Sequence, residues 1–326
     1  MIKWKRNEPD TIPLLECILR RLCGDDPLYS QYEEKLKREK AGFYGEQRLD
    51  REWLDFQIQC PFVLLNGLRF ENKDAFTHQI DALFLCPYFI FVMEVKNIAG
   101  RIDINDETNQ CIRTRADGRM EGFTNPVDQV RRHGGFVREF LRELGIAIPV
   151  VSGVVFANPY SIIGEVNARD VLVFQVSGLR YKMGKLFARY KERIIEDTEM
   201  HSIAEELIRK RRLGSSWQPK IDSQRLKRGV LCPGCNHGVQ MHYKYGSWHC
   251  SRCGNNDESA FYEALNDYRL LWGERLTNGE FREFFGIESR KTAYRILNSL
   301  DLKCEGERRY KNYLIPSTIS EMSHRK

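Results

Sequence analysis

The sequence has no long apolar run, and its first residues do not have the pattern of an export signal. None of its 326 residues belongs to a stretch of about 18 uninterrupted apolar residues, which excludes an ordinary membrane-spanning helix. The first residues, Met-Ile-Lys-Trp-Lys-Arg-Asn-Glu, lack the apolar core of a signal peptide. We therefore expect a cytoplasmic protein without a membrane partner. Its 42% hydrophobic content is enough for two or three globular domains.

The cysteines do not follow the pattern of a small secreted disulfide protein. There are ten of them, unevenly placed in a long chain. Four form two Cys-x-x-Cys pairs, and the other six are scattered. We interpret the scattered ones as reduced, small hydrophobic residues: Cys17, Cys23, Cys60, Cys86, Cys111 and Cys304.

The first two thirds of the chain carry little net charge. The total is +6, and residues 214–326 hold 18 Lys and Arg against 13 Asp and Glu. A net +5 in this part leaves +1 for the first 213 residues. We therefore expect contacts with a nucleic acid in the C-terminal third.

Residues 76–97 predict two buried strands joined by a hairpin. Apolar residues occupy both faces of each strand, as in central strands that are covered from both sides. The break at Cys86-Pro87 predicts the turn. Polar residues stand at the ends of these strands, where burial of a charge is unfavourable unless the charge is paired.

Three charged side chains converge in this hairpin. Because strand side chains alternate, Glu94 and Lys96 point to the same face. A turn at Cys86-Pro87 places Asp81 opposite Val92 and diagonally next to Glu94. Two buried carboxylates require a cation, and oxygen ligands with room for water favour Mg²⁺ or Mn²⁺. Lys96 is then placed to hold the attacking water and to offset charge on a phosphate.

A lone Glu-x-Lys pair is common on exposed strands, so the neighbouring residues decide between a structural ion pair and an active site. Roughly residues 40–160 resemble the NERD (nuclease-related) domain, of the PD-(D/E)xK nuclease type, about a third of the chain. The segments that carry the resemblance are Gly45-Glu46, Ile80-Asp81, Glu94-Val95-Lys96-Asn97, Gly100, Asn125-Pro126 and Gln129.

The resemblance implies further roles. Asp81 and Glu94 are expected to hold the catalytic metal, and Lys96 to act on water and phosphate. Glu46 corresponds to a glutamate on the first core helix that approaches the metal, and Gln129 to the edge of the active site. His133 stands four residues after Gln129 on the same helix face, where we favour a surface histidine over a ligand.

The remaining pattern predicts an α/β fold in which a mixed central sheet is flanked by helices, a restriction-endonuclease-like core. Strands are expected at 62–65 and 68–70 with a turn at Asn66-Gly67, and at 149–156 and 171–174. A hairpin at 100–104 and 111–114 is expected to extend the sheet. Helices are expected at 11–23, packed on the nuclease core, in two stretches between 28 and 56, and at about 126–144, 180–195 and 197–213.

Two Cys-x-x-Cys pairs predict a zinc ribbon. They lie fourteen residues apart and consist of Cys232 and Cys235, then Cys250 and Cys253. Four thiolates complete a closed, structural tetrahedral Zn²⁺ site. We expect Gly234 or Gly254 to permit the tight turns. The alternative, two redox dithiols, lacks the βαβ setting of that chemistry.

The last segment predicts three helices and a hairpin, and it resembles a winged helix-turn-helix. The third helix follows Ser289, and its apolar stripe leaves polar side chains on the opposite face. A protein-interaction module is the alternative. The residues expected to bind DNA, on this helix and the wing, are Arg290, Lys291, Tyr294, Arg295, Asn298, Arg308, Arg309 and Lys311.

The expected organisation is an N-terminal helical extension (1–40), a NERD-like nuclease domain (41–213), a linker (214–228), a zinc ribbon (229–256) and a winged helix-turn-helix-like domain (257–326). The expected function is divalent-metal-dependent hydrolysis of DNA. The rival is a DNA-binding or regulatory protein that no longer cleaves. The sequence leaves room for a homo-oligomer.

Overall fold

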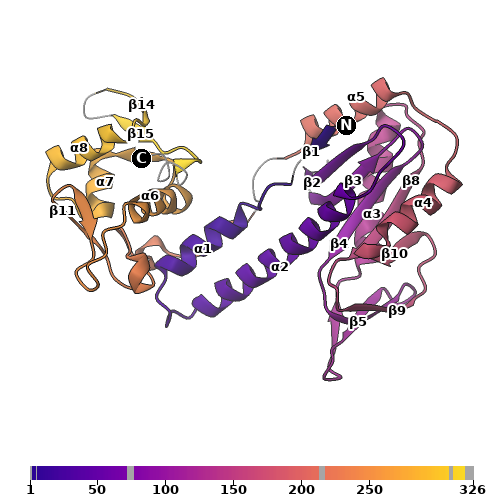
Figure 1. Cartoon of the computed structure of the whole chain (residues 1–326), viewed down its shortest axis with the longest axis horizontal. Coiled ribbons are helices and arrows are strands. Elements are labelled where there is room, and N and C mark those ends of the chain that lie inside the picture. The colour runs from indigo at the N-terminus through magenta and orange to yellow at the C-terminus, as the bar shows by residue number, and fades with distance from the viewer. Residues whose placement is uncertain (1, 5, 72–76, 213–216, 308–310, 320–326) are drawn as a thin grey trace. The chain divides into compact units, whose positions relative to one another are not determined.

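The structure, a computed structural model, describes all residues except 1, 5, 72–76, 213–216, 308–310 and 320–326 (Figure 1). The chain forms two compact units. The first contains Met1–Pro9 and Arg38–Gly214, and the second contains Asp10–Lys37 and Ser215–Lys326. In the described part of the chain, no helix has the length and apolar content needed to cross a membrane.

A six-stranded mixed sheet forms the centre of the first unit, which confirms the predicted α/β class. Its order is β1-β2-β3-β4-β8-β10. The pairs β1–β2, β4–β8 and β8–β10 are parallel, while β2–β3 and β3–β4 are antiparallel. The strands are β1 (Ile2–Trp4), β2 (Val63–Glu71), β3 (Thr77–Leu85), β4 (Ile90–Lys96), β8 (Val150–Phe156) and β10 (Val171–Gln175).

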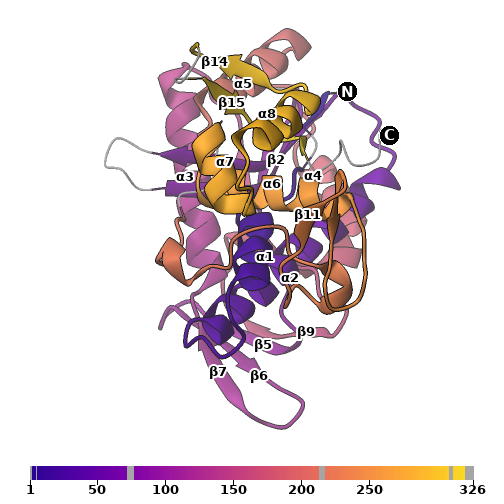
Figure 2. The same cartoon turned by 90° about the vertical axis from the view of Figure 1, so that its left-hand side faces the viewer.

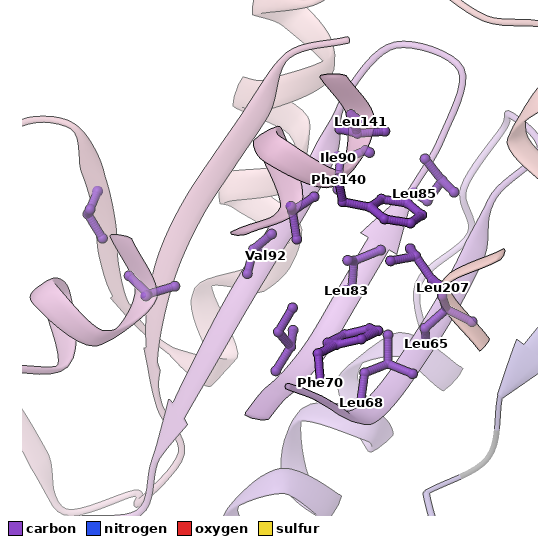
Figure 3. Packing of buried hydrophobic residues seen from close by; sticks show 14 of the residues in the cluster. Leu65, Leu68, Phe70, Leu83, Leu85, Ile90, Val92, Phe140, Leu141 and Leu207 are labelled. Atoms are coloured by element: carbon purple, nitrogen blue, oxygen red, sulfur yellow. The ribbon is translucent and has the colours of Figure 1, made fainter. Parts of the chain in front are cut away.

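Helices cover both faces of this sheet. One face packs against α3 (Pro126–Glu143) and α5 (Asp197–Lys210), and Figure 3 shows Phe140 and Leu207 of these helices beside Leu83 of β3. The other face packs against α2 (Tyr29–Leu54) and α4 (Leu179–Arg189), with Phe84 in that layer. The alternation of Leu83 and Phe84 shows why β3 is apolar on both sides. A 3₁₀ turn, η1 (Val176–Gly178), precedes α4.

Three local predictions for this unit are wrong. The segment with Gly67 is not a turn, because β2 continues through it with Gly67 at φ +63°. The two expected helices between 28 and 56 are one continuous helix, α2. The predicted hairpin after Lys96 does not extend the central sheet. It belongs to a second sheet of order β7-β6-β5-β9, made of β5 (Gly100–Asn105), β6 (Gln110–Thr114), β7 (Met120–Phe123) and β9 (Ser161–Val166).

Gly100 explains the change of sheet. It adopts φ +105°, and a Cβ atom there would lie 2.7 Å from the carbonyl oxygen of Thr114. Only glycine fits this combination of backbone conformation and close approach. The chain therefore leaves the central sheet directly after Lys96, the last residue of β4.

The second unit contains the helices and short strands of the C-terminal third (Figure 2). Two strands, β11 (His242–Lys244) and β12 (Ser247–His249), form a hairpin. Three more form a sheet of order β13-β15-β14: β13 (Arg275–Thr277), β14 (Lys303–Glu305) and β15 (Asn312–Leu314). The helices are α1 (Thr11–Arg21), α6 (Ser259–Leu271), α7 (Asn278–Phe285) and α8 (Arg290–Ser299), with 3₁₀ turns η2 (Ser223–Arg225) and η3 (Pro233–Cys235).

Helix α1 is expected from the sequence to pack on the nuclease core. It packs instead on α6 of the second unit. Asp267 of α6 is fully buried and accepts hydrogen bonds from Arg20 (2.8 Å) and from Arg21 (2.8 Å). Arg21 is itself 1% exposed and also donates to the carbonyl oxygen of Lys227. The amphipathic pattern of α1 requires a covered apolar face, but it does not specify the covering partner.

Replacing Asp267 by Ala is expected to lower the unfolding free energy of the second unit by about 3–5 kcal/mol, because the buried guanidinium of Arg21 loses its counter-ion, whereas the partly exposed Arg20 keeps its ion pair with Glu263. Urea unfolding followed by tryptophan fluorescence measures this loss. The matched control is Glu305→Ala, which removes an exposed ion pair with Arg275 and should cost no more than about 1 kcal/mol. Equal effects of the two substitutions would contradict a supporting role for the buried pair.

Candidate functional site

The register of the β3–β4 hairpin brings Asp81 closer to Glu94 than the sequence suggests. Leu85 pairs with Ile90 and Ala82 pairs with Met93, so residues 86–89 form the connection. The predicted two-residue turn is therefore wrong. The observed register is shifted by two positions along β4, so Asp81 does not lie opposite Val92. The Asp81 carboxylate accepts a hydrogen bond of 2.8 Å from the backbone N–H of Val95.

Lys96 joins Glu94 and Gln129. Its Nζ lies 2.6 Å from Oε1 of Glu94 and 3.1 Å from Oε1 of Gln129. Gln129 belongs to the first turn of α3, which begins after the N-cap Asn125 as predicted. The Lys96 side chain is 25% exposed, whereas that of Glu94 is 3% exposed. The amine therefore connects a buried carboxylate to the surface.

Glu46 of α2 reaches the same region but is held by an arginine. Arg6 forms an ion pair with Glu46 and another, of 2.9 Å, with Asp50. The same guanidinium donates to the backbone carbonyl oxygen of Asp81 at 2.9 Å. Sequence reasoning missed both Arg6 and Asp50. Asp50 follows Glu46 by four residues on one helix, so its position on the same face was available from the spacing.

Burial and mutual repulsion disfavour ionisation of the carboxyl groups. Burial, and then the charge of Asp81, raise the pKa of Glu46 to about 8. The same two causes raise the pKa of Glu94 to about 8, although Lys96 opposes them. Burial also raises the pKa of Asp81. These shifts favour the protonated forms of the carboxyl groups, and a bound cation would favour the ionised forms instead.

One histidine lies beside Glu94, although a surface position is expected for it from the sequence. His133 is buried rather than at the surface, and its Nε2 is 3.6 Å from Oε2 of Glu94. Burial lowers the pKa of His133 to about 4, so at neutral pH this approach is not an ion pair. The Nδ1 atoms of His133 and His78 are 3.3 Å apart. Among the described residues, neither Nε2 of His133 nor Oε2 of Glu94 has a hydrogen-bond partner.

The four cysteines of the two Cys-x-x-Cys pairs come together as predicted. Their Sγ atoms all lie within 4.8 Å of one another, as in a tetrahedral Cys₄ zinc site. Over the ranges that the structure describes, no other group of three or more His, Cys, Asp or Glu side chains meets this limit. Gly254 permits a turn with φ +72°, as expected. After the first Cys-x-x-Cys pair, the left-handed residues are Asn236 and His237, not Gly234.

The protein is expected to copurify with about one zinc ion per chain, bound by the four thiolates. Removal of zinc by a strong chelator should unfold residues 229–256 before the first unit. Because Cys232 and Cys250 share a core with α6 and α7, these helices should lose protection too. Metal analysis and hydrogen exchange measure both effects. A metal-free protein with four freely reactive native thiols would contradict the site.

Helix α8 has the two faces that the sequence predicts. Ala293, Ile296 and Leu297 are buried, and Ser289 caps the helix by accepting from the N–H of Thr292. The outer face is exposed and carries Arg290, Lys291, Tyr294, Arg295 and Asn298. The strands β14 and β15 follow this helix, and Lys311 lies over the ring of Tyr313 at 4.7 Å. Arg308 and Arg309 lie outside the described residues.

Comparison with known proteins agrees with the geometry of the first unit. The family model described as the nuclease-related domain, NERD, matches residues 41–157. Neither the curated proteins nor the solved structures give a match to the chain. The matched segment contains the three carboxylates, Lys96 and Gln129. Residues 41–157 of this chain therefore form a nuclease-related domain.

Proposed function

We propose that this protein is a divalent-metal-dependent deoxyribonuclease that hydrolyses phosphodiester bonds. One observation carries the proposal. Within the nuclease-related domain, Lys96 bridges the buried carboxylate of Glu94 and the amide oxygen of Gln129. The backbone N–H of Val95, between Glu94 and Lys96, fixes Asp81 at the same place.

The residues present fit a hard divalent cation. Oε2 of Glu94 is a buried oxygen without a hydrogen-bond partner among the described residues, and Asp81 is next to it along the hairpin. Two carboxylates with room for water suit Mg²⁺ or Mn²⁺, which keep several water ligands. When bound, the metal would polarise the phosphoryl oxygen and lower the pKa of water.

The side chains around this position have separate tasks. Asp81 and Glu94 would hold the metal. Lys96 orients the attacking water and offsets charge on the phosphate, because its amine is partly exposed while held by Glu94. Gln129 fixes the position of the amine. Glu46 assists at the metal only if it exchanges its partner, Arg6, for the cation.

The test is incubation of the purified protein with linear, circular and branched DNA, with and without Mg²⁺ or Mn²⁺. Cleavage that depends on the metal supports the proposal, and the DNA forms that are cut separate endonuclease from exonuclease action. Absence of cleavage with either metal on every substrate would overturn it.

A non-cleaving DNA-binding or regulatory protein is the second candidate, and one observation favours it. Arg6 forms an ion pair with Glu46, and the carboxylates of Glu46, Asp81 and Glu94 do not form a tight ligand cluster like that of the cysteines. An arginine in place of a metal would neutralise the negative charge of the carboxylates but would not support hydrolysis. Substitution of Arg6 by Gln should raise cleavage or metal affinity if the arginine competes with the cation.

We further propose that the second unit supplies affinity for DNA through α8 and the β14–β15 hairpin, as a winged helix-turn-helix. Many arginines of the first unit are paired, for example Arg113 with Glu121 and Arg131 with Asp106. By contrast, Arg290, Lys291 and Arg295 have no ion-pair partner among the residues whose structure is described. Unpaired cations on one exposed helix face suit the phosphates of DNA.

The triple substitution of Arg290, Lys291 and Arg295 by Ala is expected to weaken DNA binding. The log–log slope of affinity against salt should flatten by up to about 2–3, since each lost phosphate contact releases about 0.9 fewer counter-ions. Binding titrations at several salt concentrations measure the slope. The control removes equal charge from α4 and the segment after it, with Lys185, Arg189 and Lys191 replaced by Ala. Unchanged binding of the triple variant would favour a protein-interaction module.

A further inference from the structure

A wide groove lies within the second unit, between the turn of the β11–β12 hairpin and helix α8. Its volume is about 1170 Å³, larger than the roughly 300–1,000 Å³ of pockets that enclose drug-sized ligands. Residues 242–246 form one side, and residues 286–289 with Thr292, Arg295 and Ser299 form the other. An open groove of this size suits a section of a polymer.

Both sides of the groove are anchored in one hydrophobic core. Trp248 of β12 is buried, and its ring stacks on Phe261 of α6 with 5.6 Å between the centroids. The same ring lies 6.0 Å from Phe285, at the end of α7, directly before the turn into α8. The β11–β12 hairpin and α8 are therefore held together by this core, and the groove between them is present before a ligand binds.

Tyr245 is an unusual residue at the tip of the hairpin. Tyr245 and Gly246 both have positive φ, +52° and +91°, as the two central residues of a type I′ turn require. Asn, Asp or Gly are favoured there, and a tyrosine in this conformation is strained. The Tyr245 side chain is 100% exposed, so its ring contributes no packing to the fold. When a residue adopts an unfavourable backbone conformation and its side chain packs against nothing in the fold, a contact with another molecule is indicated.

The charges of the groove favour an anionic polymer. Lys244 and Arg295 lie on opposite sides, and within the described ranges neither has an ion-pair partner. Glu288 is the acidic residue of the lining. Hydroxyl groups of Ser289 and Thr292 line the same side as Arg295, whereas the hydroxyl of Ser299 donates to the carbonyl oxygen of Ile296. Cations across a groove, hydroxyl donors and one free aromatic ring match a sugar-phosphate backbone with unstacked bases.

We propose that this groove binds an unpaired DNA strand, with a base stacked on Tyr245 and phosphates at Lys244 and Arg295. The inference rests on the proposed function, because Arg295 also belongs to the exposed face of α8 that is assigned to DNA. It specifies the class of substrate. The preferred DNA has a single-stranded segment next to a duplex, as in a tail, a flap or a fork.

The test compares Tyr245→Asn with Tyr245→Phe in the full-length, zinc-loaded protein. The Asn variant places the favoured Asn-Gly pair in the turn, so folding and zinc content should be retained. Fluorescence anisotropy with oligothymidylate, a blunt duplex and the same duplex with a single-stranded tail gives the affinities in buffer without added divalent metal. Binding of Tyr245→Asn to oligothymidylate and to the tail should weaken about 5-fold to 100-fold, while Tyr245→Phe should bind like the wild type.

Each outcome decides the proposal. Loss of affinity for tailed DNA with unchanged affinity for blunt duplex supports it. Unchanged binding of Tyr245→Asn to oligothymidylate would overturn it and leave the groove to a protein partner, and an equal loss on blunt duplex would overturn the strand preference. These measurements involve no cleavage. A wild-type protein that binds tails through Tyr245 but never cuts DNA would refute the nuclease proposal and leave the groove assignment standing.

Discussion

Replacing Glu94 by Gln is expected to abolish metal-dependent DNA cleavage, with a loss of more than about 100-fold. Removal of a group that only orients a metal ligand already costs 10–100-fold in metal affinity or activity, and Glu94 is proposed as a ligand itself. The substitution keeps the volume of a side chain that is 3% exposed while removing its charge. Initial cleavage rates at saturating Mg²⁺ or Mn²⁺ measure the loss.

A stability measurement shows whether the Glu94→Gln variant is folded. The folded-state pKa of Glu94 is raised to about 8, above its ordinary value. This group therefore contributes stability below its unfolded-state pKa, and the contribution is lost as the pH rises through about 8. Without added divalent metal, the first unit of the variant should be more stable than that of the wild type at pH 9, with a smaller difference at pH 5.

The control for this experiment is Glu107→Gln, which changes an exposed carboxylate in the turn between β5 and β6. It should alter neither cleavage nor the pH dependence of stability. Undiminished cleavage by a contaminant-free Glu94→Gln protein would remove Glu94 from the metal site.

Much of the candidate site could be predicted because local patterns determine it. The period of two in β4 places Glu94 and Lys96 on one face whatever the rest of the chain does. Asn125 followed by Pro126 determines the start of α3, which positions Gln129. Each Cys-x-x-Cys turn supplies two thiolates, and the two turns need only approach each other closely enough to share one metal ion.

The hairpin register could not be obtained in the same way. Tyr88 and Phe89 are as apolar as the strand that follows, so the pattern cannot separate a loop residue from a strand residue. The backbone N–H of Cys86 bonds to the carbonyl oxygen of Phe89 at 3.2 Å, which closes a four-residue connection. A shift of two preserves the faces of the side chains, and so the composition of the site survives the error.

The partners of Arg6 and of helix α1 could not be predicted, because they lie far away in the sequence. Nothing near Arg6 in the sequence indicates that it pairs with a glutamate forty positions later. The partner of α1 is more than two hundred positions away, at Asp267. Amphipathic patterns identify buried faces, whereas these pairings depend on which surfaces meet after the chain has folded.

Replacing Lys96 by Ala separates chemistry from binding, and its effect decides between the two functions. A catalytic amine acts mainly in the transition state, so cleavage should fall by about 100-fold to 10,000-fold while DNA affinity is nearly unchanged. The α8 triple variant should show the opposite behaviour, with weaker affinity and a smaller change in the rate on saturating DNA. Exposed Lys191→Ala is the matched control.

The metal dependence of Lys96→Ala must be measured too, because the charge of Lys96 lowers the pKa of both Asp81 and Glu94. Its removal should weaken metal binding at neutral pH, since more protons must be displaced from the carboxylates. A deficit that remains at saturating Mg²⁺ belongs to the amine itself. If high metal concentration or higher pH restores the full rate, Lys96 serves the carboxylates and not the water. If the wild type binds DNA tightly through α8 and no metal supports cleavage, the regulatory function replaces the enzyme.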